Sequence, residues 1–168
     1  MFVLEFTAGK VQRVQPGSRW KSCCASLAVT VVRSSIVYGP FSDSWPINIA
    51  QKLQSGNWGN FKKHADGICN LIYISDLVAG ILTAARNSAA IGEIFNMSGP
   101  EIVSWNEYFR RFNAVSPEPV DFDEFSRNAV YVSDKAKDRL GFTPRFDLDT
   151  GLTITVSWLR YVGLAAGD

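Results

Sequence analysis

Three hydroxyl-bearing side chains directly follow the most apolar stretch of this sequence. Ser34, Ser35 and Tyr38 come after the run LAVTVV at residues 27–32. Such a run is typical of a strand buried on both faces of a parallel sheet, and open α/β sheets bind ligands at the carboxyl ends of their strands. Hydroxyls at that place can hydrogen-bond a carboxamide or a sugar. The alternative is a turn whose polar groups its own hydroxyls satisfy.

The other side chains capable of chemistry indicate weaker sites. His64 is the only histidine and lies beside two lysines, so a solvated loop position is its simpler interpretation. Cys23 and Cys24 are adjacent and Cys69 stands alone, so no CxxC pair exists for zinc or for a redox site. We therefore expect no metal, and free thiols in a reducing, cytoplasmic compartment.

Composition places the chain among single globular domains. It has 168 residues, of which 46% are hydrophobic and 20% charged, and its net charge is +1. This apolar content excludes disorder as the main state. The balance of 17 basic and 16 acidic residues indicates neither nucleic acid nor an anionic membrane as a partner. No apolar run approaches the roughly 20 residues that span a bilayer, and Glu5 interrupts any signal-like start.

Alternating strand and helix patterns predict an α/β fold. Strands are expected at residues 27–32, 69–74 and 93–97, and helices at 47–54, 76–85, 105–112, 134–140 and 149–159. Ser75 or Asp76 is expected to cap the second helix, Ser104 the third and Asp149 the last. Residues 1–26 show no clean period, and we treat them as an atypical segment before a domain at 27–168.

Four segments in order resemble a known family. They are VTVVRSSIVYGP, NLIYISDLVAGIL, GEIFNMSGPEIVSWNEYF and SDKAKDRLGFTPRFDLDTGLTITVSWL. From about residue 27 to residue 162 the chain resembles the C-terminal half of the extended short-chain dehydrogenases/reductases, the NAD(P)-dependent epimerases, dehydratases and reductases. The resemblance implies the last strands of a Rossmann-type sheet and a small mixed α/β substrate-binding domain. It implies hydride exchange, as an isomerase or oxidoreductase, on a sugar nucleotide or a small hydroxy or keto compound.

Two parts of the family's machinery have no counterpart in the sequence. No GxGxxG or GxxGxxG phosphate loop occurs. The family's Tyr-x-x-x-Lys pair would fall in the first segment, where Lys10 stands 23 residues before Arg33, but Phe6 occupies the tyrosine position. A phenyl ring has no proton to exchange, so Lys10 is a weak catalytic candidate, in a degenerate helix or as a solvated charge. We expect the chain to bind neither NAD nor NADP tightly and to have no turnover alone.

The resemblance also implies site residues within the matching segments. The resemblance assigns Ser34 and Ser35 to the cofactor. It assigns four residues to the substrate: Tyr38, Gly39, Asn70 and Tyr73. Asn70 stands where nucleotide-sugar members usually carry an arginine, and an amide cannot replace a charged fork on a diphosphate. The alternative for Asn70 is an amide bonded to backbone at a strand edge.

A non-catalytic binding or interaction module derived from this fold is the alternative function. The strand at 27–32 has only the strand at 93–97 as a partner from the family's sheet, which leaves an unpaired apolar edge. We therefore expect self-association, or a partner chain that supplies the missing strands.

Overall fold

The fold centres on one apolar strand. In the computed structural model, which describes residues 2–7, 10–13, 29–54, 67–112 and 128–165, this strand is β3 (Val29–Ser34). Its first four side chains are all buried. An uninterrupted β-branched run has no polar face to turn to water, so both of its faces must be covered. The prediction of a doubly buried strand is confirmed over Val29–Val32, and its first two expected residues, 27 and 28, lie outside the described residues.

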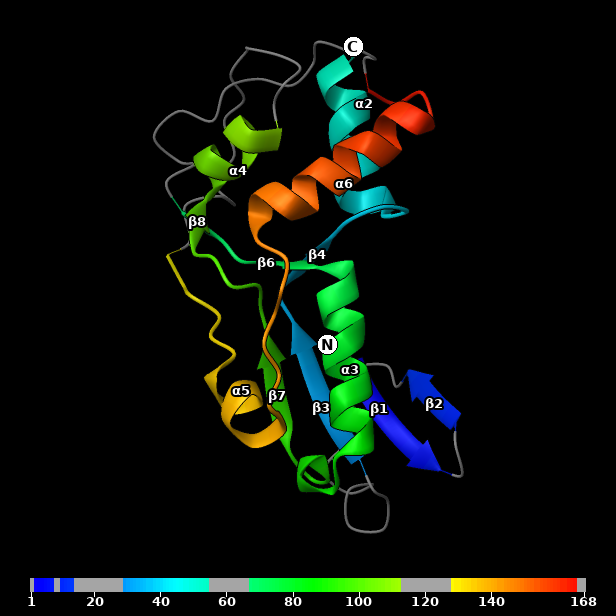
Figure 1. The fold of residues 1–168 in the computed structure, drawn as a ribbon, viewed down its shortest axis with the longest axis vertical. Coiled ribbons are helices and arrows are strands. Elements are labelled where there is room, and N and C mark those ends of the chain that lie inside the picture. The colour runs from blue at the N-terminus through cyan, green and yellow to red at the C-terminus, as the bar shows by residue number, and fades with distance from the viewer. Residues whose placement is uncertain (1, 8–9, 14–28, 55–66, 113–127, 166–168) are drawn as a thin grey trace.

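β3 lies inside a four-stranded sheet of order β2–β1–β3–β7 (Figure 1). β7 (Ile94–Met97) is parallel to β3, whereas β1 (Phe2–Thr7) is antiparallel to both β3 and β2 (Lys10–Arg13). The expected unpaired edge of β3 is therefore wrong, because β1 pairs along it from Phe2 opposite Val32 to Glu5 opposite Val29. A segment outside the family resemblance supplies the neighbouring strand.

The same hairpin settles the place of Lys10. Thr7 lies opposite Lys10 and Phe6 opposite Val11 in the β1–β2 ladder. Phe6 and Lys10 thus stand on two neighbouring strands and not one turn apart on a helix. The degenerate catalytic helix is wrong.

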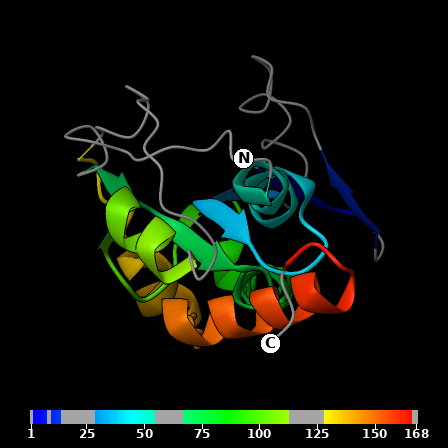
Figure 2. The same cartoon turned by 90° about the horizontal axis from the view of Figure 1, so that it is seen from above.

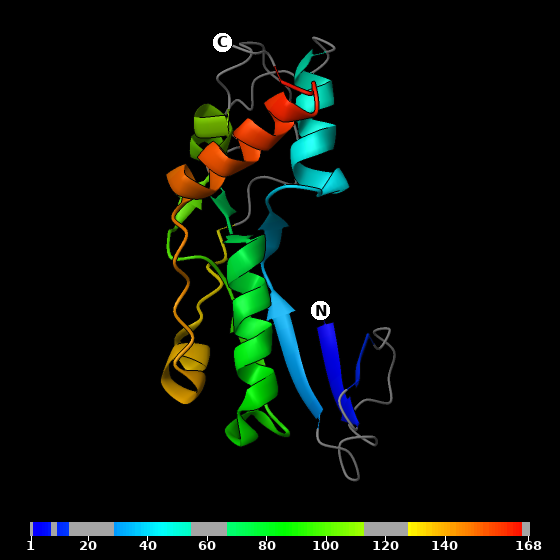
Figure 3. The ribbon, with the colours of Figure 1, turned by 45° about the vertical axis from the view of Figure 1, so that its right-hand side comes forward.

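The remaining elements divide between two ends of the molecule (Figure 1), which lie one behind the other when the molecule is seen from above (Figure 2). The helix α3 (Ile74–Arg86) lies along β3 at the sheet end (Figure 3). The other helices are α2 (Asn48–Gln54), α4 (Trp105–Phe112), α5 (Asp134–Leu140) and α6 (Leu148–Tyr161), with a π-helical turn at Asp43–Ile47 and a 3-10 turn at Ser88–Ala90. Two short ladders join the ends, β4 (Ile36–Tyr38) parallel to β6 (Leu71–Tyr73) and β5 (Ile68–Cys69) antiparallel to β8 (Val103–Ser104).

Two apolar clusters fill these ends, and β6 separates them. Ile72 belongs to the cluster formed with β3, β7, α3 and α5, whereas Leu71 and Tyr73 belong to the cluster formed with α2, α4 and α6. Successive side chains of a strand point to opposite faces, so the three residues of β6 contribute side chains to both apolar clusters. The strand β6 and its neighbour β4 therefore hold the sheet end and the helical end together.

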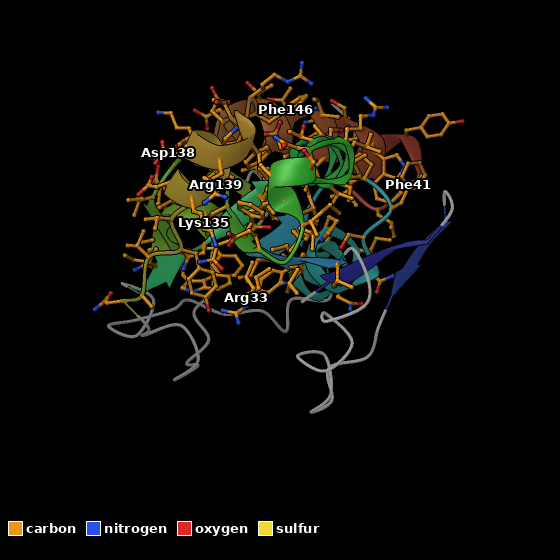
Figure 4. All side chains as sticks on the ribbon, turned by 90° about the horizontal axis from the view of Figure 1, so that it is seen from below. Arg33, Phe41, Lys135, Asp138, Arg139 and Phe146 are labelled. Atoms are coloured by element: carbon orange, nitrogen blue, oxygen red, sulfur yellow. The ribbon has the colours of Figure 1, made fainter. Side chains whose placement is uncertain are left out.

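The helix α5 is fixed to the sheet by packing and by charge. Ala136 and Leu140 are buried in the cluster around β7. The ammonium of Lys135 lies 2.7 Å from a Glu93 carboxylate oxygen and 5.1 Å from the centre of the Phe95 ring. The exposed Arg139, seen beside Lys135 in Figure 4, also pairs with Glu93.

Two local predictions about helix ends are confirmed. The helix α5 covers the predicted residues 134–140, and Gly141 follows it in the left-handed conformation with φ of 69°. The Ser104 hydroxyl accepts the backbone N–H of Glu107 at 3.1 Å, which is the expected cap of α4.

Two predicted caps are wrong. The helix α3 begins at Ile74, ahead of Ser75 and Asp76, so neither precedes it as a cap. The cap of α6 is Asp147, whose carboxylate accepts the N–H of Thr150 at 2.8 Å, and Asp149 lies inside the first turn. A cap depends on where the chain turns into the helix, and the observed N-cap positions, Tyr73 and Asp147, lie two or three residues before the predicted ones.

Candidate functional site

The candidate site begins at the carboxyl end of β3, where the chain passes from the sheet to the helical end (Figure 3). Ser34 is half-buried and ends the strand, while Arg33 is exposed and points away from the sheet (Figure 4). Ser35 is 7% exposed, and its N–H donates to the Met97 carbonyl at 2.9 Å. Its hydroxyl has no hydrogen-bond partner among the described residues. A buried hydroxyl in this state is one that a ligand amide can satisfy.

Tyr38 projects from β4 into the apolar cluster of the helical end. Its hydroxyl donates to the Asp147 carbonyl at 3.4 Å, and its ring packs edge-on to Tyr73 with centroids 5.5 Å apart. Burial, and after it the negative charge of Glu101, raises the pKa of Tyr38. The phenol therefore stays protonated at neutral pH and can donate a hydrogen bond, but it is not a base.

Gly39 makes the turn after β4 possible. Its φ is 138°, and a Cβ atom there would lie 2.6 Å from Cγ2 of Ile74 at the start of α3. Only glycine has both the conformation and the space for this contact. The turn therefore packs directly against the first residue of α3.

Tyr73 ends β6 and is buried between Tyr38 and Phe146, whose ring centroid is 4.5 Å away. Burial, followed by the nearby Asp76 carboxylate, raises the pKa of Tyr73. The structure thus brings Tyr38, Gly39 and Tyr73 together as a packed group. Their contact with a substrate stays a prediction.

Asn70 lies apart from that group, with both of its amide atoms engaged. Its Nδ2 donates to the Ala129 carbonyl at 2.7 Å, and its Oδ1 accepts the N–H of Tyr131 at 2.7 Å. These bonds hold the segment before α5 against the start of β6. The geometry is that of the alternative interpretation, an amide bonded to backbone, and substrate contact by Asn70 stays a prediction.

A cavity of about 290 Å³ opens beside Asn70. Its walls are the segment 98–102, which follows the carboxyl end of β7, the segment 130–134 before α5, and residues 142–144 after it. The small space between Tyr38, Tyr73 and Phe146 holds only about 10 Å³ and is too small for a ligand. Of the six site residues inferred from the sequence, Asn70 is the one that lines the larger cavity.

Sequence reasoning missed Glu101, which joins three elements. One carboxylate oxygen accepts the N–H of Leu148 at 2.7 Å, and the other accepts from Arg111 at 3.1 Å. Arg111 in turn pairs with Glu107 and Asp149. The only sequence signal was an acid four residues after a strand ends, and its partners lie far along the chain.

Asp76 has a different role from the one predicted for it. Its carboxylate is 1% exposed, and Oδ2 accepts the N–H groups of Arg145 and Phe146, each at 2.9 Å. It therefore fixes the segment that leads into α6. Phe146, which packs on Tyr73, is positioned by this contact.

The described residues do not fit a whole dinucleotide cofactor. A pyrophosphate needs a helix N-terminus that follows a glycine-rich turn. The residues that precede α3, α4, α5 and α6 are instead Tyr73, Ser104, Ser133 and Asp147. The Ser35 hydroxyl could hydrogen-bond the carboxamide of a nicotinamide ring, but the described residues offer no site for the pyrophosphate.

Other expectations are bounded by what the structure describes. His64, Cys23 and Cys24 lie outside the described residues. Within the described ranges, no group of three or more His, Cys, Asp or Glu residues is placed to hold a metal ion. No helix in those ranges is long and apolar enough to cross a membrane.

Comparison with solved structures identifies the fold. The chain superposes on UDP-glucose 4-epimerase from Thermotoga maritima with UDP-glucose (TM-score 0.64, 24% identity), with 79% of this chain and 46% of that one covered. It superposes on UDP-glucuronic acid 4-epimerase from Bacillus cereus with UDP-glucuronic acid and NAD (TM-score 0.67, 18% identity), with 79% and 45% covered. These superpositions show that the chain has the fold of the matching part of these two epimerases.

Sequence comparison adds one curated relative. The chain is 28% identical to chloroplast stem-loop binding protein of 41 kDa b from Arabidopsis thaliana, with 74% of this chain and 38% of that protein covered. No family model matches the chain. The chain spans less than half the length of these relatives.

Proposed function

We propose that this chain provides the substrate side of an NAD(P)-dependent epimerase, dehydratase or reductase that acts on a sugar nucleotide or a small hydroxy or keto compound. In this proposal the Ser34–Gly39 loop lies beside the nicotinamide and the reacting carbon. The glycine-rich loop and the acid/base tyrosine come from outside this sequence, so the chain alone has no turnover.

One observation carries the proposal. The parallel strands β3 and β7 end beside a loop whose Ser35 hydroxyl is buried and has no partner in the described residues. Ligands of open α/β sheets bind at such carboxyl ends. Proteins that share this fold have been solved with UDP-glucose, UDP-glucuronic acid and NAD.

The test is a titration of the whole chain followed by the amide resonances of residues 34–39. NAD or NADP should give no saturable signal below about 1 mM, which corresponds to roughly −4 kcal/mol. UDP-glucuronic acid should shift the Ser35 and Tyr38 amides, and Ser35→Ala should weaken that response. Ser88→Ala, an exposed serine far from the loop, is the matched control. A micromolar dissociation constant for NAD would overturn the proposal.

The curated relative favours a second candidate, a binding module without catalysis. That relative is by name a stem-loop binding protein. In this case a nucleic-acid stem-loop should bind more tightly than any nucleotide sugar, with an affinity that falls steeply as salt rises. A sugar-nucleotide response at Ser35 and no salt-dependent stem-loop binding would exclude this candidate.

The proposal extends to compartment and assembly. A reducing compartment such as the cytoplasm fits the buried free thiol of Cys69. In the active assembly this chain would associate with a second copy, or with a partner chain that supplies the family's missing strands. Sedimentation at micromolar concentration measures whether the chain associates with itself. A single monomeric species would contradict the proposed self-association.

A further inference from the structure

The cavity beside Asn70 has an unusual rim. Four exposed large apolar side chains line it: Ile102, Val130, Tyr131 and Val132. Ile102 comes from the segment after β7, and the other three come from the segment before α5. Exposed apolar residues scattered singly need no explanation, but several converging on one cavity mark a binding site.

The polar side chains of the inner wall are already paired with protein atoms. Both amide atoms of Asn70 bond backbone groups. The Ser133 hydroxyl accepts the N–H of Ser98 at 2.7 Å and donates to the Ser98 carbonyl at 3.2 Å. Both oxygens of Glu101 are also engaged. A sugar in this cavity would have to compete with these existing bonds for the side chains of the inner wall, which costs free energy.

The charges around the cavity cancel. Glu101 is offset by its ion pair with Arg111. Asp134 and Lys137 stand three residues apart on α5, exposed and of opposite sign. No excess of positive charge exists here to hold a phosphate or a carboxylate.

We propose that this cavity binds a small, uncharged, apolar molecule of about the size of one or two fused rings. A volume of about 290 Å³ suits such a ligand, since pockets for larger organic ligands run from about 300 to 1,000 Å³. The binding energy comes from covering the apolar rim. The site is separate from the Ser34–Gly39 loop, which does not line it, and it does not depend on the proposed sugar-nucleotide function.

The test uses indole as the probe and the methyl resonances of the intact chain as the readout. Indole should shift the methyl groups of Ile102, Val130 and Val132 saturably. Ile102→Ser should weaken binding roughly five- to tenfold, because the ligand covers the Ile102 side chain. Val132→Ser, from the opposite wall, should have a similar effect. Ile91→Ser removes an isoleucine that is 53% exposed, against 67% for Ile102, and does not line the cavity, so it should leave binding unchanged.

Three outcomes would overturn the proposal. The first is equal indole binding by the wild type, Ile102→Ser and Val132→Ser. The second is a response of these methyl groups to glucuronate or phosphate and not to indole. The third is self-association in sedimentation that Ile102→Ser abolishes, which would assign the groove to a second copy of the chain.

Discussion

Replacing Asp76 tests whether a single buried carboxylate holds the two ends of the molecule in register. Asp76 lies in the first turn of α3, and its partners Arg145 and Phe146 lie 69 and 70 residues further along the chain. Asp76→Ala removes both bonds, whereas Asp76→Asn keeps an oxygen that can accept them. Asp76→Asn keeps the side-chain volume almost unchanged, whereas Asp76→Ala also removes the volume of the carboxyl group from a buried position.

The expected magnitude follows from the two hydrogen bonds. A hydrogen bond to a charged group contributes about 1.5–3 kcal/mol to stability. Two such bonds set an upper range of about 3–6 kcal/mol, and part of this is recovered if the N–H of Arg145, an exposed residue, bonds water in the variant. We expect Asp76→Ala to lower the free energy of unfolding by about 3 kcal/mol and Asp76→Asn by about 1 kcal/mol.

Urea denaturation at neutral pH measures both values. Asp138→Ala, which removes an exposed carboxylate on α5, is the matched control and should change the free energy of unfolding by less than about 0.5 kcal/mol. The near-ultraviolet signal of the aromatic residues should also change in Asp76→Ala, because Phe146 packs on Tyr73. A loss below about 1 kcal/mol in Asp76→Ala would refute the tethering role.

Three further perturbations follow from other contacts. Gly39→Ala should lower the free energy of unfolding in urea by about 2–3 kcal/mol, because it combines a φ of 138° with a 2.6 Å clash. Gly92→Ala, at a φ of 79° in open space, should lower it by about 1 kcal/mol. Equal losses in the two variants would contradict this. Burial raises the pKa of the Cys69 thiol, so a variant with Cys69 as its only cysteine should react with a thiol reagent no faster than it unfolds, and rapid labelling of the folded protein would refute this. Hydrogen bonds from Arg110 and Arg111 lower the pKa of Glu107 from 4.5 to about 2. A carboxylate whose pKa falls on folding stabilises the protein above its unfolded pKa, so the difference in Tm between wild type and Glu107→Gln should be full above about pH 4.5 and vanish towards pH 2. A difference that does not change with pH would count against the ion pair.

Local structure was predictable because neighbouring residues encode it. The helix α5, its terminal Gly141 and the Ser104 cap of α4 depend on contacts within a few residues. The buried strand β3 follows from an uninterrupted apolar run, and its parallel partner β7 from a shorter run bounded by Glu93 and Ser98. The order of the four family-like segments was enough to identify the α/β fold, which the superpositions confirm.

The candidate site was predictable only in part. Sequence reasoning placed Ser35, Tyr38 and Tyr73 near one another, and the structure does bring the two tyrosines into contact. It anticipated the backbone-bonded amide of Asn70 as an alternative, but it could not foresee that Tyr38 and Tyr73 lie buried in the core or that Asn70 lines a cavity. Burial depends on what packs over a side chain, and residue type does not specify it.

The amino-acid sequence by itself determined the class of fold, most helices and strands, and the absence of a glycine-rich loop and of the catalytic tyrosine. Only the tertiary structure decided that β1 covers the edge of β3, that Asp76 binds backbone beside α6, and that Glu101 joins α4 to α6. The contacts of Asp76 and Glu101 join segments that are distant in the chain. The contact of β1 involves a strand whose sequence has no regular pattern. The free energy of the whole packed molecule selects these pairings. The edge of β3 and the buried carboxylate of Asp76 would each be destabilising without a partner.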